Sequence, residues 1–400
     1  MNSVATEYKE TKIGLLPKDW EVKKAKYIFE NYTDKNHNGD LEVLAVTQDR
    51  GVVPRGSLEI DIKSSEASIK TYKKVEKGNF IISLRSFQGG IEYSDIEGIV
   101  SPAYTVLKSK IEISDIFYKY LLKKEDFISR LNSAVIGIRE GKQISYSDFS
   151  ELYLQIPTLK EQEKIAEILS TCDLTVEKQE QLIEKKKEFK KGLMQRLLSG
   201  EVRFKEFKDE WKVVKLGDYL IKHNEKSEYN NQYPVLTSSR KGIFLQSNYY
   251  SGNDVASEDT TGYNVVPRGY FTYRHMSDDL IFKFNINDIV DNGIVSTLYP
   301  VFTVKNMDSY FLRTKLNEGE EFKRFALEQK QGGSRTYMYF SKLETLKLKI
   351  PALEEQLKIS EVLKAADEEI ELLEKELKVL KLQKKGLMQR LLTGEVRVKV

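Results

Sequence analysis

The sequence has few of the residues that build disulfide or metal sites. A single cysteine, Cys172, excludes a disulfide framework and a cysteine-rich zinc site, and so little cysteine is typical of a reducing compartment. The three histidines, His37, His223 and His275, are isolated and form no metal-ligand spacing such as H-E-x-x-H. We therefore expect no metal site in this chain.

Long apolar runs and a large excess of charge of one sign are also absent. No stretch approaches the roughly 20 apolar residues of a membrane helix, and the N-terminal residues lack the apolar core of a signal peptide. Together with the low cysteine content, this predicts a cytoplasmic protein. Because 64 basic residues face 61 acidic ones, any nucleic-acid binding must come from local patches rather than from the net charge of +3.

Motifs that handle nucleotides or methyl donors are missing. The segment GIREGK at Gly137 is one residue short of a phosphate-binding loop and has no hydroxyl after Lys142. The chain has no [ND]PP[YF] run for holding a flipped base and no glycine-rich strand-to-helix loop for a cofactor. The sequence therefore predicts a protein that is not an enzyme and holds no cofactor of its own.

What the chain does contain is an internal repeat. Lys190 to Arg203 reads KKGLMQRLLSGEVR, and Lys384 to Arg397 repeats it with one exchange, Thr393 for Ser199. The same offset relates further pairs upstream: Ile156-Pro157 with Ile350-Pro351, Glu161-Gln162 with Glu355-Gln356, and Asp173 with Asp367. An ungapped register of this length indicates a rigid helix, because one inserted residue would rotate everything after it by about 100°.

Both repeats predict long helices that follow Pro157 and Pro351. Their apolar residues recur in heptads, and these seam residues are Leu169, Val176, Ile183, Leu193, Leu363, Ile370, Leu373, Leu377, Leu380 and Leu387. Gln179 and Lys186 interrupt the first seam, which favours pairing between the two helices of one chain over self-association. Each helix of about 35 to 40 residues would span roughly 55 Å and stop at a glycine. We expect the GEVR segment after it to have strand character.

The stretches before each helix share a few matching residues at corresponding positions and little other sequence. Trp20 matches Trp211, Gly78-Asn79-Phe80 matches Gly269-Tyr270-Phe271, and Ile99-Val100-Ser101 matches Ile294-Val295-Ser296. Short β-rich runs separated by turn residues predict two mixed α/β domains, each with a twisted sheet. The expected fold is α+β with a pseudo-two-fold duplication. Its expected boundaries are a first domain at 1–155, a first helix at 156–204, a second domain at 205–349 and a second helix at 350–400.

Two loops that follow apolar strands carry candidate DNA contacts. Arg85, Ser86 and Gln88 come after FIISL, and Arg274 and His275 come after YFTY. An arginine there can pair with guanine O6 and N7, and a glutamine with adenine N6 and N7. The alternative, a structural arginine that binds a carboxylate, stays equally open. Further basic residues in turn-like loops are candidate phosphate contacts: Arg50, Arg55, Arg139, Lys142, Arg240, Lys241 and Arg335.

Several of these segments together resemble one known family. The duplicated KKGLMQRLL[ST]GEVR ends, the IPxLxEQxKI helix openings, the LPKDWEV run at Leu16 and the GNFIISLRS segment resemble the specificity subunit of type I restriction-modification systems. The resemblance covers the whole chain. It implies two target-recognition domains joined by two helices in an intramolecular antiparallel coiled coil, each domain reading half of a split, asymmetric DNA site. The helices would set the gap, with half-site centres roughly 34 Å apart.

The resemblance also implies partners. Double-stranded DNA and two methyltransferase (modification) subunits would bind this chain, and two restriction (motor-endonuclease) subunits can join; no membrane is involved. S-adenosylmethionine, ATP and Mg would be used by those partners. The segment after the second helix would lie near Trp20. Two alternatives stay open: a specificity subunit of a methyltransferase-only or type IIB-like system, and a coiled-coil protein-interaction scaffold, which leaves the basic glycine loops unexplained.

Overall fold

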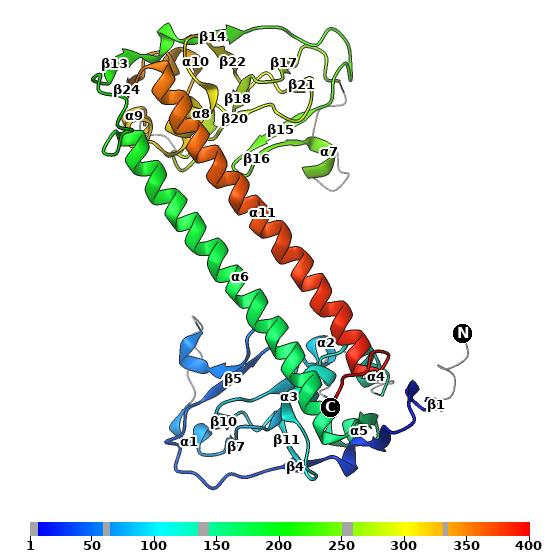
Figure 1. Ribbon diagram of the computed structural model, residues 1–400. Helices are drawn as coiled ribbons and strands as arrows, with labels where there is room; N and C mark the ends of the chain where they lie inside the picture. Colours follow the sequence, from blue (N-terminus) through cyan, green and yellow to red (C-terminus); the bar gives the residue numbers. More distant parts are fainter. Residues whose placement is uncertain (1–6, 59–64, 135–143, 250–258, 331–334) are drawn as a thin grey trace. The chain divides into compact units, whose positions relative to one another are not determined.

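The chain divides into two units that each combine one domain with parts of two long helices. The computed structural model describes residues 7–58, 65–134, 144–249, 259–330 and 335–400. Unit 1 comprises Met1–Glu180 and Lys375–Val400, and unit 2 comprises Gln181–Glu374. The long helices are α6 (Leu159–Ser199) and α11 (Leu353–Leu392), drawn in green and in orange to red in Figure 1. The two predicted long helices and the α+β class are confirmed.

Unit 1 is built on a four-stranded antiparallel sheet. Its strand order is β4-β11-β8-β9, and β3 pairs separately with β12. The strands are β1 (Tyr8–Thr11), β2 (Gly14–Pro17), β3 (Glu21–Lys24), β4 (Phe29–Tyr32), β5 (Leu44–Thr47), β6 (Gly51–Pro54), β7 (Lys73–Val75), β8 (Phe80–Ile82), β9 (Glu92–Tyr93), β10 (Gly98–Val100), β11 (Thr105–Ser109) and β12 (Tyr153–Ile156). The short helices are η1 (Ala25–Tyr27), η2 (Arg55–Ser57), α1 (Glu66–Ile69), α2 (Ser86–Gly89), α3 (Asp115–Leu121), α4 (Glu125–Ser133) and α5 (Tyr146–Ser150).

Unit 2 repeats this topology. Its central sheet has the order β14-β22-β18-β20, and β13 pairs with β24 as β3 does with β12. The strands are β13 (Lys212–Lys215), β14 (Leu220–His223), β15 (Leu236–Ser239), β16 (Gly242–Leu245), β17 (Asn264–Pro267), β18 (Phe271–Tyr273), β19 (Met276–Ser277), β20 (Phe284–Ile286), β21 (Asn292–Val295), β22 (Val301–Val304), β23 (Thr336–Tyr337) and β24 (Lys347–Ile350). The short helices are η3 (Leu216–Asp218), α7 (Gln246–Tyr249), α8 (Ser309–Glu318), α9 (Glu320–Glu328) and α10 (Phe340–Leu343).

The long helices contribute to the core of each domain. In unit 1, Leu169 of α6 and Leu391 of α11 are buried with the domain's aromatic core. In unit 2, Leu198 of α6 and Leu363 of α11 are buried in the same way. An insertion into either helix would turn these leucines away from the core, which is the physical reason for the ungapped repeat.

The two helices begin and end alike. Each begins two residues after a proline, and Gln162 and Gln356 each donate to the carbonyl of that proline at 2.9 Å. Each ends at a glycine with positive φ, +75° at Gly200 and +70° at Gly394. The amide of the residue two positions later, Val202 or Val396, then bonds back to an arginine carbonyl six residues earlier at 3.2 Å, which closes the end of the helix.

The segment after each helix is not a strand, so that prediction was wrong. Val202 and Val396 instead bond back to their own helix ends, so the chain leaves each helix in a turn.

A buried carboxylate joins the start of one helix to the segment that follows the other. In unit 1, Glu161 of α6 accepts from Trp20 Nε1 at 2.8 Å and from Arg397 Nε at 2.7 Å. In unit 2, Glu355 of α11 accepts from Trp211 Nε1 at 3.2 Å and from Arg203 Nε at 2.9 Å. We call each set a Glu–Trp–Arg cluster. The expected proximity of the segment after α11 to Trp20 is thereby confirmed.

The helices run antiparallel to each other within each unit. In unit 1, Lys381 pairs with Glu180 at 2.6 Å, and Lys384 with Asp173. In unit 2, the matching pairs are Lys187 with Glu374 at 2.8 Å, and Lys190 with Asp367. The ten predicted seam residues are all buried or half-buried, as a shared apolar stripe requires.

No helix in the described ranges combines the length and the apolar character that a membrane crossing needs.

Candidate nucleic-acid interface

In unit 1, a β-hairpin and a strand-end loop meet at the surface. The hairpin is β5–β6 with its turn at residues 48–50, and the strand-end loop covers residues 83–90 after β8. Gln48 Nε2 donates to the carbonyl of Arg85 at 2.7 Å and lies 3.5 Å from Gln88 Oε1. The side chains of Arg85 and Gln88 are exposed, as is that of Arg50 in the turn. Three of the predicted contact residues therefore share one surface.

Two other predicted residues of unit 1 have internal roles. Ser86 is only 1% exposed, and its hydroxyl accepts from the amide of Ser83 at 2.9 Å, which shapes the strand-end loop. Arg55 is half-buried, with its guanidinium 5.6 Å from the ring centre of Tyr72 and 3.3 Å from the hydroxyl of that tyrosine. Both side chains support the loops rather than project from them.

Glu92 is a buried carboxylate beneath this surface. Lys123 Nζ lies 2.6 Å from it, and the same lysine lies 3.5 Å from the carbonyl of Gln48. Burial raises the pKa of the Glu92 carboxyl above its usual range, although Lys123 opposes the shift. Lys123 thereby connects α3 and α4 to the hairpin turn.

Unit 2 places its own hairpin and strand-end loop together. The hairpin is β15–β16 with Arg240 and Lys241 in its turn, and the strand-end loop begins at Arg274 after β18. Arg240 and Arg274 line one cavity of about 210 Å³ with Asp278. Asn285 of β20 fixes the hairpin by donating to Ser238 Oγ at 2.8 Å and to the carbonyl of Ser239 at 2.9 Å.

The arginines of this surface differ in their partners. Arg240 makes a two-pronged contact with Asp279 at 2.8 and 2.7 Å, and its hydrogen bond lowers the pKa of the Asp279 carboxyl. Arg335 pairs with Asp278 at 2.9 Å. All four side chains stay about half exposed. Such exposed pairs are weak, so a phosphate or a base edge can replace the carboxylate at little cost.

His275 lies beneath the surface. It is 6% exposed, its Nδ1 is in contact with the carbonyl of Leu298, and its ring stacks on Tyr339 at 5.3 Å. Tyr337 stacks on Tyr339 at 5.7 Å, and both tyrosines are partly exposed. The remaining predicted residues, Arg139 and Lys142, lie outside the described residues.

Several residues that organise these surfaces carry no recognisable signal in the sequence. Gln48, Lys123 and Asn285 join the hairpins to the sheets, yet each stands alone in the sequence without a motif. The alternation of Tyr337 and Tyr339 around Met338 is a signal that could have indicated an exposed aromatic face, since alternate residues of an extended segment share one side.

Comparison with known proteins decides the family. The model of the type I restriction modification DNA specificity domain matches twice, at residues 17–186 and 208–382. The chain belongs to this specificity family. The type I restriction enzyme MjaVIII specificity subunit of Methanocaldococcus jannaschii is 28% identical over 326 residues, covering 76% of this chain and 75% of that protein. The MjaIX specificity subunit of the same organism is 23% identical, covering 98% and 97%.

A solved structure agrees on the fold. The HsdS subunit of Thermoanaerobacter tengcongensis matches with a TM-score of 0.54 at 13% sequence identity, covering 95% of this chain and 98% of that one. This likeness bears on the fold, whereas the family rests on the two model matches. Each family match begins shortly before β3 or β13, runs into the long helix that follows and ends within that helix, at residue 186 of α6 and at residue 382 of α11.

Proposed function

We propose that this specificity subunit reads a bipartite, asymmetric DNA site, one half with each recognition domain, and is not itself catalytic. The observation that supports this is the repetition of one sheet topology with different exposed side chains at matching loops. Unit 1 presents Arg50, Arg85 and Gln88, whereas unit 2 presents Arg240 and Arg274. Arginine and glutamine forks suit guanine and adenine edges, respectively, so the two domains would select different bases.

The helix pair would set the spacer and dock two methyltransferase subunits. Helices of 41 and 40 residues, held by leucines in both domain cores, cannot change length without losing that packing. The methyltransferases, and two restriction subunits where present, would use S-adenosylmethionine, ATP and Mg. In a methyltransferase-only or type IIB-like system, the same subunit would serve a different set of partners.

A footprint on duplex DNA tests this function. The purified subunit with its methyltransferase subunits should protect two separated stretches of a specific duplex, with the unread spacer between them. A single continuous footprint, or equal protection of every sequence, would contradict the bipartite reading. Absence of any DNA binding would favour the protein-interaction scaffold.

The spacer can be tested separately. Inserting one heptad into α6 and one into α11 should lengthen the preferred spacer or abolish assembly, because the helices would carry the domains apart. An unchanged preference in an assembled complex would show that the helices do not set the gap.

A further inference from the structure

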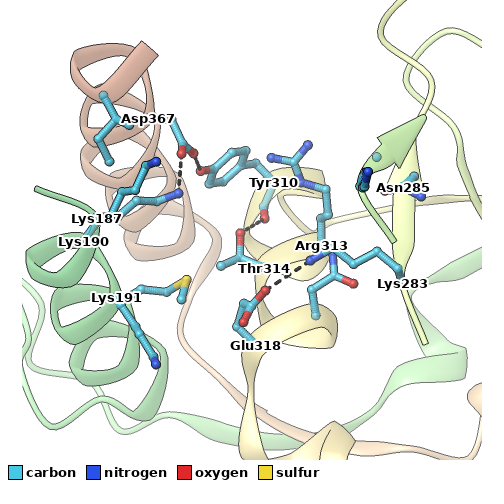
Figure 2. Close-up of a pocket in the computed structure, with 15 residues that line it drawn as sticks. Lys187, Lys190, Lys191, Lys283, Asn285, Tyr310, Arg313, Thr314, Glu318 and Asp367 are labelled. Carbon is cyan, nitrogen blue, oxygen red and sulfur yellow. Dashed lines mark hydrogen bonds and ion pairs between the residues drawn. The ribbon is translucent and has the colours of Figure 1, made fainter. Parts of the chain in front are cut away.

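A cavity of about 530 Å³ in unit 2 carries an excess of positive charge. Its wall residues come mostly from α6, α8, α11 and the β15–β16 hairpin. Figure 2 shows the labelled residues of the three helices. Its cationic wall residues are Lys187, Lys190, Lys191, Lys241, Lys283 and Arg313. Only two acidic side chains, Glu318 and Asp367, are part of the described wall.

Three of these cations are neutralised by acids. Lys190 pairs with Asp367, Lys187 pairs with Glu374 at 2.8 Å, and Lys283 pairs with Glu318 at 3.2 Å. Among the described residues, no carboxylate lies within ion-pair distance of Lys191, Lys241 or Arg313. The cavity therefore has three cations that no carboxylate of the described residues balances.

Arg313 is held in place by the wall. Its guanidinium lies 4.6 Å from the ring centre of Tyr310, and the hydroxyl of Tyr310 donates to Asp367 at 2.5 Å. In Figure 2 the ring of Tyr310 stands between the Arg313 guanidinium and Asp367, and the α6 lysines lie beyond Asp367; all of these residues line the same cavity. A guanidinium fixed by an aromatic face loses less conformational freedom when it binds an anion, which favours phosphate recognition.

Unit 1 shows that the fold does not need this excess. Lys385, the repeat counterpart of Lys191, pairs with Glu125 at 2.6 Å. Glu92 occupies the β9 position that corresponds to Asn285 on β20, and it is buried against Lys123. Unit 1 therefore has a carboxylate at this strand position where unit 2 has an amide. Helix α9 begins with Glu320 as α4 begins with Glu125, but Glu320 pairs with Lys323 of its own helix at 2.7 Å.

We propose that the unit 2 cavity binds a phosphate-bearing polyanion. Lysine and arginine donors suit phosphate oxygens, and three uncompensated cations fit a ligand with several negative charges. One source is the DNA backbone, since Lys241 also belongs to the hairpin turn of the candidate interface; this source rests on the proposed function. The other source is a free polyphosphate such as a nucleoside triphosphate.

The test uses the full chain and a pair of matched double variants. Lys191→Ala/Arg313→Gln removes two of the uncompensated cations. Lys385→Ala/Lys119→Gln removes their unit 1 counterparts, since Lys119 follows the N-cap Ser114 of α3 as Arg313 follows the N-cap Asp308 of α8. Circular dichroism and the thermal midpoint of each variant establish that it is folded. Calorimetric titration with sodium tripolyphosphate and fluorescence titration with a duplex are then compared.

We expect the unit 2 double variant to lose at least tenfold in tripolyphosphate affinity and the unit 1 variant less than twofold. If duplex DNA displaces tripolyphosphate from the wild type, the DNA backbone is the ligand; if it does not, a free polyphosphate is. The wild type can also bind duplex and not tripolyphosphate. The backbone source is then supported if the unit 2 variant alone loses duplex affinity, and loses it equally on all sequences. The slope of log affinity against log salt concentration should also decrease by an amount that corresponds to about two phosphate contacts.

Two results would overturn the proposal. One is an equal loss in both double variants, which would indicate diffuse electrostatics; the other is a unit 2 variant unchanged toward both ligands. Failure of every form to bind duplex would count against the proposed function alone, because the tripolyphosphate titration still reports on the cavity.

Discussion

The two units keep the same contacts where the long helices meet the domains and differ where the loops face outward. Glu161 and Glu355 are each 2% exposed at the side chain and accept from a tryptophan and an arginine in the same way. A buried carboxylate must keep its partners, because an unpaired one is costly. Exposed loops have no such constraint, and their side chains have diverged.

A second comparison shows how the same contact can be made from different positions. Asp173 and Asp367 are repeat counterparts, and each accepts from a tyrosine hydroxyl at 2.5 Å. Tyr120 lies six residues after the N-cap of its helix, whereas Tyr310 lies two residues after its own. Both aspartates therefore accept from a tyrosine, but the two tyrosines lie on different turns of their helices.

The largest effect should come from removing the shared carboxylates. Glu161→Ala and Glu355→Ala each leave a buried tryptophan N–H and an arginine without their acceptor, so each should destabilise its own unit by about 3 kcal/mol or more. The chain has two tryptophans, one in each unit. Urea unfolding followed by ¹⁹F NMR of 5-fluorotryptophan-labelled protein would therefore report on each unit separately.

The matched controls are exposed glutamates nearby. Glu163→Ala and Glu354→Ala should leave both resonances with wild-type unfolding midpoints. If Glu161→Ala shifted the Trp211 resonance as much as that of Trp20, the two clusters would not be independent.

Alanine at the glycines that end the helices should have the next largest effect, and its cost should differ between the two units. Alanine at either position must adopt positive φ, which costs about 1 to 2 kcal/mol. At Gly394 a Cβ would also lie 2.4 Å from the Pro17 ring, whereas at Gly200 it would only touch Trp211 at 3.4 Å. We expect Gly394→Ala to cost about 1 to 3 kcal/mol more than Gly200→Ala in chemical denaturation. Equal losses would show that the chain around Pro17 yields freely.

Substitution of the loop arginines tests whether the two domains recognise different half-sites. Arg85→Ala and Arg274→Ala should each reduce discrimination at one half-site only, by about 1 to 3 kcal/mol, if each makes a two-pronged contact with a guanine. Binding to duplexes with single base changes in either half measures this. Arg196→Ala, an exposed helix arginine paired with Glu201, serves as the control. Equal losses on all duplexes would identify phosphate contacts instead.

The smallest effect concerns a contact that, among the described residues, unit 1 has and unit 2 lacks. Arg397 also binds Asp19, at 2.7 and 3.1 Å, and its hydrogen bond lowers the pKa of the Asp19 carboxyl below 3.8. Because the pKa of Asp19 is lower in the folded state than in the unfolded state, ionised Asp19 stabilises the folded state at pH values above its unfolded pKa. This stabilisation is lost as the pH falls from 3.8 through the folded pKa. Because the pair is exposed, the effect should be under about 1 kcal/mol.

Asp19→Asn should therefore weaken unit 1 slightly at pH 6 and make no difference at a pH below the folded pKa of Asp19. The Trp20 resonance would report this in urea titrations at both pH values, while the Trp211 resonance should not respond. A larger effect of the variant in acid than at pH 6 would contradict the assigned sign.

Parts of the candidate interface were predictable and parts were not. The strand-end position of Arg85 and Arg274 follows from the apolar runs before them, and both side chains are exposed. Ser86 and His275 are neighbours of these arginines in sequence but are buried, because the chain turns inward after one residue. Nothing in the local sequence indicates that Arg240 would meet Asp279, since that contact joins a hairpin to a separate loop.

The sequence by itself determined the two long helices, their seam, their glycine endings and the duplication of the domains. These features depend on local periodicity and backbone preference, which act over a few residues. The tertiary structure alone decided which loop side chains are exposed, which arginines have carboxylate partners and where unit 2 gathers uncompensated charge. Burial and electrostatics depend on neighbours far away in the sequence, such as Lys191 of α6 and Arg313 of α8, which line one cavity.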